Sequence, residues 1–484
     1  MMAHAVSYAT ESGKREGLQW LSPVDHVLRY ADSLIRDAGY PGIETQMHIH
    51  FRGRVSVAVL HRGISQLSLR YPVLAARLIE PADREEKRGY WQFRQGKVCP
   101  LFESDVVSNS LEDIFRYAGG LLTSGRDLTV ADPIAFHLLH CPDGRDVLVI
   151  QYSHVLMDNR MALPLLRELN YLADSLSTSF EPELFSAEPD RPITRYLRQF
   201  SRERRHAAVR AAMQPETYAP RGKAATLIPA GAQSSAPARL RIVTRAIGQD
   251  ETAGLRSQTI GMCGYPSLSM AVLASAFRAV DRFGPPEDDS RDFVAAIGIP
   301  LHLRHPRQLV FQNLTSIVPM RLGAREIRDR PHAVRLLSKQ LQHLLWRDMD
   351  LGVLESIAIL SRRFHYLDWI LRHILLHSCS LWYAHFGTLD ALGKRLFGQE
   401  VETAYFAGGP VWSSTGLSLL VSQYCGRTHL QAAFDPQLIS ESLADNFLDF
   451  LLGDLRSLRS SRRKARYEAG ESGRRRDSDG ARRR

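Results

Sequence analysis

The stretch that decides the fold is VLVIQYSHVLMDN, residues 147–159. Residues 147–152 are apolar almost throughout, which predicts a strand near the centre of a sheet. Residues 133–139 predict a second strand, and the turn CPDGR, 141–145, joins the two. Residues 161–173 carry apolar side chains at helical spacing. The predicted local architecture is therefore a hairpin, a short loop and a helix.

The loop after the central strand carries the chemistry. His154 and Asp158 form a His-x-x-x-Asp pattern, which occurs once in a chain with 18 His. About one chance match is expected, so the spacing alone is weak. Its place between strand and helix, where side chains can face a cavity, gives it weight. Histidine suits proton transfer because its ordinary pKa is about 6.5, so His154 is the candidate general base. The alternative is a core histidine bonded to a backbone carbonyl.

Periodicity predicts further elements on both sides of the hairpin. The predicted helices cover residues 21–35, 55–69, 250–259, 267–283 and 440–458, and the predicted strands cover residues 46–51, 90–93, 240–246, 293–304, 312–322, 417–423 and 429–434. Residues 369–386 read as a buried or interfacial amphipathic helix. Residues 214–239 hold four Pro and predict a linker.

Length and charge favour two lobes of ordinary soluble protein. The 484 residues exceed the roughly 250–300 that a single core usually reaches, so we expect lobes over 1–213 and 240–458. The net charge is +10, and residues 459–484 supply +7 of it. The remainder is close to neutral, which argues against nucleic acid as a partner. The basic tail is predicted to be disordered; it is either solvated or contacts an acidic carrier protein or an anionic membrane.

Cysteine usage and hydropathy bear on the compartment. The five Cys show no zinc or redox spacing, and the N-terminal residues are polar. We therefore expect a reducing cytoplasm, with contact at the surface of the inner membrane as a further option. No run of about 18 apolar residues is uninterrupted.

Other chemistries find little support in the residues. No G-x-S-x-G elbow accompanies Ser153, which argues against a Ser-His-Asp hydrolase. The pairs His48/His50 and His373/His377 could bind a metal, but the second lacks the Glu of H-E-x-x-H. No metal is predicted.

Several segments in order resemble one superfamily. Residues 153–159, SHVLMDN, are similar to the His-His-x-x-x-Asp-Gly motif of the chloramphenicol-acetyltransferase-like, thioester-dependent acyltransferases. These include nonribosomal condensation domains, polyketide-associated acyltransferases, wax ester synthases and plant alcohol acyltransferases. Residues 21–32, 63–78, 297–304, 313–321 and 415–440 resemble further segments of the same superfamily.

The resemblance implies an α/β fold, an α+β sandwich of two similar lobes in a V, with a solvent tunnel between them. His154 would lie at the midpoint, a thioester on coenzyme A or an acyl carrier protein would enter from one face, and an alcohol or amine acceptor from the other. No further cofactor is implied. Asp158 would pair with Arg304 and hold the loop; the alternative is an exposed Asp that caps the next helix. Candidates for oxyanion or substrate contacts are Asn313, Thr315, Ser413, Ser414, Ser153 and Asn159.

Two positions depart from the motif. Ser153 replaces the first His, which leaves His154 in the acting position. Asn159 replaces Gly, whose freedom at positive φ Asn matches next best. The predicted activity is O- or N-acyl transfer in bacterial secondary-metabolite or lipid biosynthesis. The alternative is an inactive condensation-like module that recruits an acyl carrier protein.

Overall fold

The structure is a computed structural model of the 484-residue chain. The residues it describes are 17–80, 89–174, 193, 197–214, 222–229, 231–232, 237–265, 268–285, 290–300, 313–361, 368–369, 371–372, 379–412 and 415–458.

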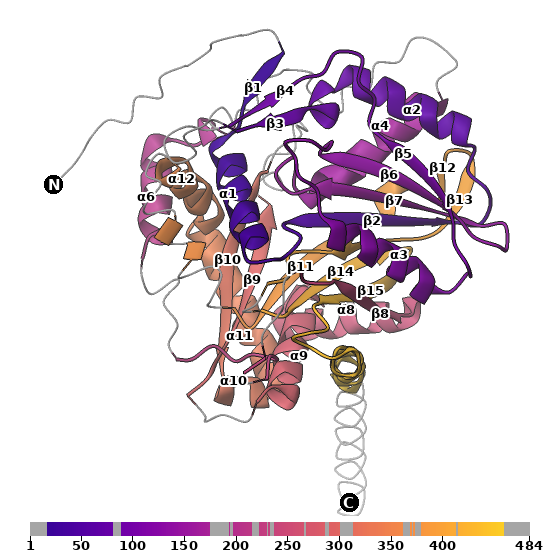
Figure 1. Ribbon diagram of the computed structural model, residues 1–484. Helices are drawn as coiled ribbons and strands as arrows, with labels where there is room; N and C mark the ends of the chain where they lie inside the picture. The colour runs from indigo at the N-terminus through magenta and orange to yellow at the C-terminus, as the bar shows by residue number, and fades with distance from the viewer. Residues whose placement is uncertain are drawn as a thin grey trace, which may run out of the picture.

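The first large sheet is built around the predicted hairpin. Its order is β12-β13-β2-β7-β6-β5, and β7 lies in its interior as predicted. The strands are β2 (Glu44–Phe51), β5 (Leu101–Asp105), β6 (Ile134–His140), β7 (Asp146–Ser153), β12 (Arg395–Leu396) and β13 (Gln399–Gly408). Alternate residues of β2 and β7 pack against α2 (Val57–Arg70) and α4 (Ala162–Asp174), and the others face α3 (Leu111–Ser124). Figure 1 shows these helices on opposite sides of the sheet.

The second large sheet has the order β10-β9-β11-β14-β15-β8. Its strands are β8 (Arg241–Ile247), β9 (Asp292–Pro300), β10 (Thr315–Gly323), β11 (Leu381–Thr388), β14 (Leu417–Tyr424) and β15 (Arg427–Phe434). The turn between β14 and β15 places Cys425 and Gly426 at φ 49° and 74°, as a two-residue hairpin of type I′ requires. A small third sheet joins β1 (Leu18–Trp20), β4 (Tyr90–Gln92) and β3 (Arg77–Ile79).

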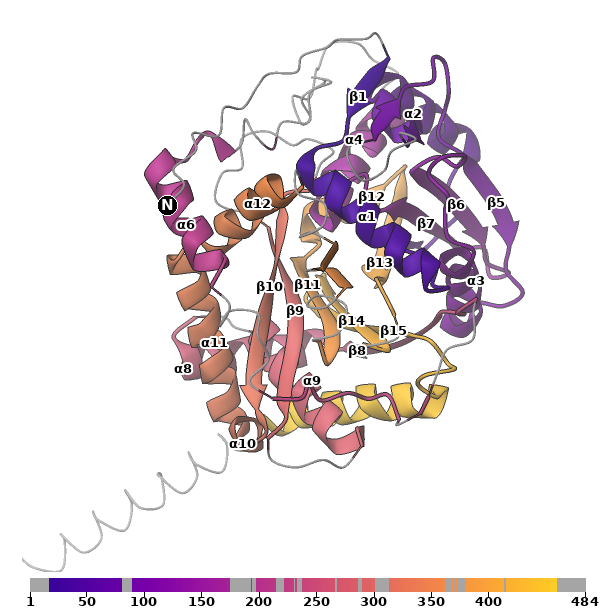
Figure 2. The same ribbon diagram turned by 60° about the vertical axis from the view of Figure 1, so that its left-hand side comes forward.

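Helices cover the outer side of the second sheet and join the lobes. They are α1 (Pro23–Asp37), α6 (Arg202–Ala212), α8 (Gln249–Cys263), α9 (Leu268–Phe283), α10 (Ala324–Arg328), α11 (Arg330–Trp346) and α12 (Met349–Leu360). Residues 441–458 are also helical, at the end of the described chain. Short 3-10 turns occur elsewhere: η1 (Pro72–Ala75), η2 (Asn159–Met161) and η5 (Asp390–Leu392). Figure 2 shows α11 and α12 beside β10. Because α1 packs against α12, the first predicted helix connects the first lobe to the second.

The strand pairing corrects one part of the predicted division. Residues 240–458 were expected to form the second lobe, but β13 pairs antiparallel with β2 of the first sheet. The chain therefore returns to the first lobe at β12 and β13, and the next strand, β14, lies back in the second sheet. Strand pairing is decided by edge partners far away in sequence, which periodicity within one segment does not reveal.

The predicted helix over 369–386 is wrong in its C-terminal part. Leu381–Thr388 form β11, which runs parallel to both β9 and β14. A buried central strand carries an apolar run much like that of a buried helix, so the pattern LWYAHF does not separate the two. His373 and His377, considered above as a metal pair, lie outside the described residues, as does the basic tail.

The sheets meet around one buried tyrosine. Tyr405 of β13 lies with its ring centroid 5.2–5.3 Å from those of His48, His50 and His429. Its hydroxyl is hydrogen-bonded to Nε2 of His50 over 2.6 Å, and His429 Nε2 is 2.9 Å from the Thr403 hydroxyl. His48 and His50 are therefore part of interlobe packing. Among the described residues, no cluster of three His, Cys, Asp or Glu side chains could hold a metal ion.

This histidine cluster predicts acid sensitivity of the fold. Burial lowers the pKa of His50 to about 3 and that of His429 to about 4, against 6.5 when unfolded. The unfolded chain therefore binds more protons below pH 6.5, so the stability that these neutral rings contribute falls as pH drops from 6.5 toward 4. The expected loss is up to about 1.4 kcal/mol per pH unit for each ring. Urea unfolding between pH 7 and pH 4.5 measures it.

A variant at His50 separates the contribution of its imidazole from those of the other groups that titrate in the same pH range. His50→Phe should be less stable at pH 7, because the buried Tyr405 hydroxyl loses its hydrogen-bond partner, yet its stability should fall less steeply with acid. Burial raises the pKa of Glu44 to about 7, which opposes the trend equally in both proteins. Exposed His61 serves as the control position, and His61→Phe should keep the wild-type slope. Equal slopes in all three proteins would contradict the prediction.

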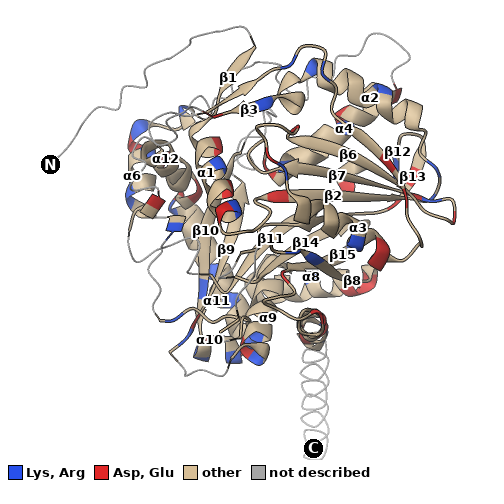
Figure 3. Cartoon of the chain, in the orientation of Figure 1, with Lys and Arg blue, Asp and Glu red and all other residues tan. Residues whose placement is uncertain are grey.

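Surface charge is mixed over the described residues. Figure 3 shows acidic and basic residues interspersed along helices such as α1, α3 and α6. In the described part of the chain no single helix is long and apolar enough to cross a membrane. The helices α8 and α9 together have sufficient length and apolar composition, but they meet at an angle of 93°.

Candidate active site

The His-x-x-x-Asp loop begins where β7 leaves the first sheet. The His154 N–H donates to the Ile43 carbonyl over 3.0 Å, which keeps the loop beside the start of β2. Ser153 is buried, and its hydroxyl accepts the Val155 N–H over 3.2 Å. Ser153 was a candidate substrate contact; here its oxygen shapes the turn that exposes the next residue.

Asp158 ties this loop to the second sheet. The residue is 2% exposed, and one carboxylate oxygen accepts the Leu314 N–H over 3.1 Å and the Thr315 hydroxyl over 3.0 Å. The other oxygen accepts the Arg160 N–H over 3.0 Å, so Asp158 caps η2. The cap was predicted as the alternative, but for an exposed carboxylate. The structure shows a buried one that also anchors the start of β10.

Asn313 joins three parts of the chain at the same point. Its amide donates to the His154 carbonyl over 2.7 Å and to Asp25 Oδ1 over 3.3 Å. Asp25 is fully buried and forms the capping box of α1 with Ser22. Asn313 and Thr315 were expected as oxyanion contacts. Their hydrogen bonds hold the loop between α1 and β10.

His154 is partly exposed as a residue, and its main chain is fixed on both sides. Burial lowers the pKa of His154 below 6.5; the nearby Asp158 carboxylate and the Asn313 side chain oppose that shift without reversing it. The imidazole is therefore neutral at pH 7 and can accept a proton. The arrangement presents one accessible base on a loop that is held from both lobes.

Solved structures with the same arrangement of elements decide the fold. A trichothecene 15-O-acetyltransferase from Fusarium sporotrichioides matches with a TM-score of 0.67 at 11% identity, over 91% of this chain and 94% of that chain. The first condensation domain of the calcium-dependent antibiotic synthetase, in complex with a substrate analogue, matches with 0.67 at 15% identity, over 91% and 96%. This chain has the chloramphenicol-acetyltransferase-like fold of condensation domains.

The same fold also serves a different reaction. The epimerization domain from the third module of tyrocidine synthetase B matches with a TM-score of 0.64 at 13% identity, over 92% of this chain and 97% of that one. No protein-family model matches the sequence, and no curated protein is found as a relative. The likeness thus concerns the chloramphenicol-acetyltransferase-like fold, and the chemistry must be argued from the site.

Three predicted site residues lie outside the described part of this fold: Arg304, Ser413 and Ser414. The pairing of Asp158 with Arg304 stays a prediction. A different cation does lie in the field of Asp158. Arg160, two residues later, is partly buried, and burial lowers its pKa while the Asp158 carboxylate raises it.

The departure at Asn159 has a simple geometric explanation. Asn159 begins η2 and is not among the described residues with positive φ, so the backbone does not need glycine there. Its side-chain oxygen accepts the hydroxyl of Tyr152, a buried residue of β7. Asn159 therefore fastens the loop to the strand that precedes it.

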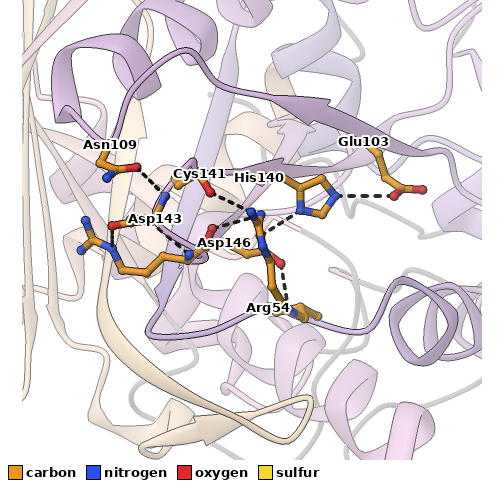
Figure 4. Close-up of polar contacts among 9 residues, drawn as sticks. Arg54, Glu103, Asn109, His140, Cys141, Asp143 and Asp146 are labelled. Atoms are coloured by element: carbon orange, nitrogen blue, oxygen red, sulfur yellow. Dashed lines mark hydrogen bonds and ion pairs between the residues drawn. The ribbon is translucent and has the colours of Figure 1, made fainter.

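A second polar cluster lies at the opposite end of β7 (Figure 4). The buried Asp146 accepts from Arg54 over 2.7 Å, from the Val55 N–H over 2.7 Å, and is 2.8 Å from His140 Nδ1. His140 Nε2 lies 3.6 Å from Glu103. Because both oxygens of Asp146 are in use, the cluster serves to fix the β6–β7 hairpin against the start of α2.

Sequence reasoning missed two residues around the loop, Asp25 and Arg160. Asp25 could have been found from the sequence, because Ser22 and Asp25 have the spacing of a capping box. An acidic residue among apolar residues at the start of a helix is a second signal. Arg160 could have been noticed as a charged residue directly after the His-x-x-x-Asp motif.

Proposed function

We propose that this protein is an acyltransferase with His154 as its general base. The proposal is carried by one observation: a partly exposed histidine, with its pKa lowered, stands on a loop held by Asp158 between the two lobes. The similar solved structures include an acetyltransferase and a starter condensation domain in complex with C8-CoA and Leu-SNAC. They support acyl transfer from a thioester to a small-molecule acceptor.

The reaction balances with one base and no further cofactor. The acceptor oxygen or nitrogen attacks the thioester carbonyl as neutral His154 takes its proton. The carbon–sulfur bond then breaks, and the imidazolium returns the proton to the leaving thiolate. The products are an ester or amide and a free thiol. Asp158 and Asn313 hold the loop in place before the substrate binds, so the reaction does not bear the entropic cost of positioning the imidazole.

The acyl donor is a thioester of coenzyme A or of an acyl carrier protein, and the acceptor is an alcohol or an amine. Thiol release measures the reaction. Purified protein is mixed with a panel of acyl-coenzyme A donors and with alcohol or amine acceptors, beside His154→Ala. Acceptor-dependent release that vanishes in the variant supports the proposal.

A silent panel would point either to a carrier-protein donor or to the alternative, the recruiting module, and a pull-down of acidic carrier proteins would follow. That alternative rests on Ser153 and Asn159, and both have structural roles in the loop that an active enzyme can equally use.

The lowered pKa of His154 predicts a pH profile. Because the neutral imidazole is the active form, kcat/KM with an alcohol acceptor should be level at neutral pH. It should fall in acid with an apparent pKa below 6.5, since burial disfavours the protonated ring. An alcohol is chosen because its own ionisation lies outside the range. A midpoint above 6.5 would contradict a base in this environment.

A further inference from the structure

One face of α1 is lined with charged residues although most of it is buried. The face holds four residues at intervals of three or four positions: Asp25, Arg29, Asp32 and Arg36. The first three are buried, and Arg29 pairs with Glu80 over 2.5 Å. Figure 2 shows α1 between α12 and the first sheet. Burying charges is costly unless they are well partnered, so the contacts of the two aspartates show what this face does.

Asp32 holds the residue to which His154 is bonded. One oxygen of Asp32 accepts the Ile43 N–H over 2.7 Å, and the other accepts from Arg36 over 2.7 Å. The Ile43 carbonyl in turn accepts the His154 N–H over 3.0 Å. Ile43 therefore stands between Asp32 and His154, with both of its main-chain polar groups in use. A shift of Ile43 reaches the His154 main chain through a single hydrogen bond.

Gly42 shows that the chain is shaped for this close approach. Its φ of 96° lies in the left-handed region that favours glycine. A Cβ at this position would also clash with the Asp32 carboxylate and the Arg36 guanidinium. A larger residue would therefore push Asp32 away from Ile43. The hydrogen bond between the two depends on a glycine that nothing else at this position requires.

Asp25 holds the other side of His154. Its Oδ1 accepts from the Asn313 amide over 3.3 Å, and the same amide donates to the His154 carbonyl over 2.7 Å. Asp25 and Asp32 lie two turns apart on one helix, about 10 Å along its axis. One rigid element thus fixes the main-chain N–H of His154 through Ile43 and the main-chain carbonyl through Asn313.

We propose that Asp32 is a positioning residue for His154, so that α1 sets the direction in which the imidazole points. The inference rests on the proposed function and adds the element that orients its base. A base displaced by about 1 Å can lose about 10²-fold in rate. Because Asp32 acts through Ile43, its loss should lower kcat and leave KM nearly unchanged.

The test removes the acceptor of Asp32 and then restores it without the charge. Asp32→Leu should lower kcat for thiol release about 10–100-fold, with KM within about threefold. The double variant Asp32→Asn/Arg36→Gln keeps an oxygen for the Ile43 N–H and gives the new amide group a side-chain oxygen to donate to. It should be less stable than wild type yet keep kcat within about threefold. A double variant as slow as Asp32→Leu would overturn the proposal.

The opposite end of β7 offers a matched control. Asp146 is also buried, and it also accepts a main-chain N–H and an arginine, from Val55 and Arg54, each over 2.7 Å (Figure 4). Asp146→Leu should lose stability as Asp32→Leu does but keep kcat within about threefold. Equal losses of kcat in both variants would mean that turnover follows stability, and the proposal would fall. Urea unfolding sets conditions in which each variant is folded.

A milder substitution covers the case in which Asp32→Leu does not fold. Asp32→Ser places its hydroxyl oxygen one bond nearer the main chain, so the Ile43 N–H should lose its acceptor while little volume is disturbed. The same loss of kcat with an unchanged KM is expected. A folded Asp32→Ser protein with wild-type kcat and wild-type exchange at residues 153–158 would contradict the proposal.

Hydrogen exchange of the loop tests the contact without any substrate. Peptides covering residues 153–158 should exchange faster in Asp32→Leu and at the wild-type rate in Asp146→Leu, because only the first variant frees the partner of the His154 N–H. Unchanged exchange in Asp32→Leu overturns the proposal, whatever the turnover. Faster exchange in a protein that transfers no acyl group would retain the contact and reject the acyltransferase.

Discussion

Replacing His154 by alanine is expected to lower kcat/KM for acyl transfer about 10²–10⁴-fold, the contribution of one well-placed base. The effect should fall on kcat, because the imidazole takes the acceptor proton only as the bond forms. The variant should stay folded, since the loop is held by the His154 main chain, Asp158 and Asn313 and not by the imidazole. Thiol release and thermal unfolding, measured on the same preparation, test both parts.

The matched control removes a histidine from the surface. His206 lies exposed on α6, and His206→Ala should keep full activity. If His154→Ala retained activity within threefold while folded, the base would lie elsewhere and the proposed mechanism would fall.

Asp158→Ala should produce the largest loss of stability, about 3–5 kcal/mol in the free energy of unfolding. The substitution leaves three donors in a buried place without their acceptor: the N–H groups of Arg160 and Leu314 and the Thr315 hydroxyl. Each unsatisfied buried group costs about 1–3 kcal/mol, less whatever water recovers. Urea unfolding measures the change.

A graded variant shows whether the loss follows the hydrogen bonds. Thr315→Val removes one of the three donors without creating an unsatisfied group and should cost about 1 kcal/mol. An Asp158→Ala protein that is inactive yet as stable as wild type would mean that the carboxylate acts on the imidazole and not as the tie between the lobes.

The part of the site that could be predicted is local in the chain. The apolar strand, the loop and the amphipathic helix are each encoded within about a dozen residues, so β7, His154, Asp158 and α4 were predicted together. Asn313 and Thr315 were also singled out, by residue type and by their place in the strand predicted over 312–322. In the structure both make hydrogen bonds that hold the His154 loop, and their contact with an oxyanion stays a prediction, because residue type alone does not tell an oxyanion donor from a hydrogen bond that holds a loop.

The sequence by itself determined the hairpin, the order of most strands and helices, and the histidine that can act as a base, since each depends on periodicity or on spacing within one segment. Only the tertiary structure decided that β13 crosses into the first sheet, that 381–388 is a strand, and that Asp158 anchors the start of β10. These features depend on partners as distant as the 156 residues between Asp158 and Leu314. Strand pairing and burial across such distances depend on which surfaces are available when the whole chain packs. The sequence of a single segment therefore does not determine them.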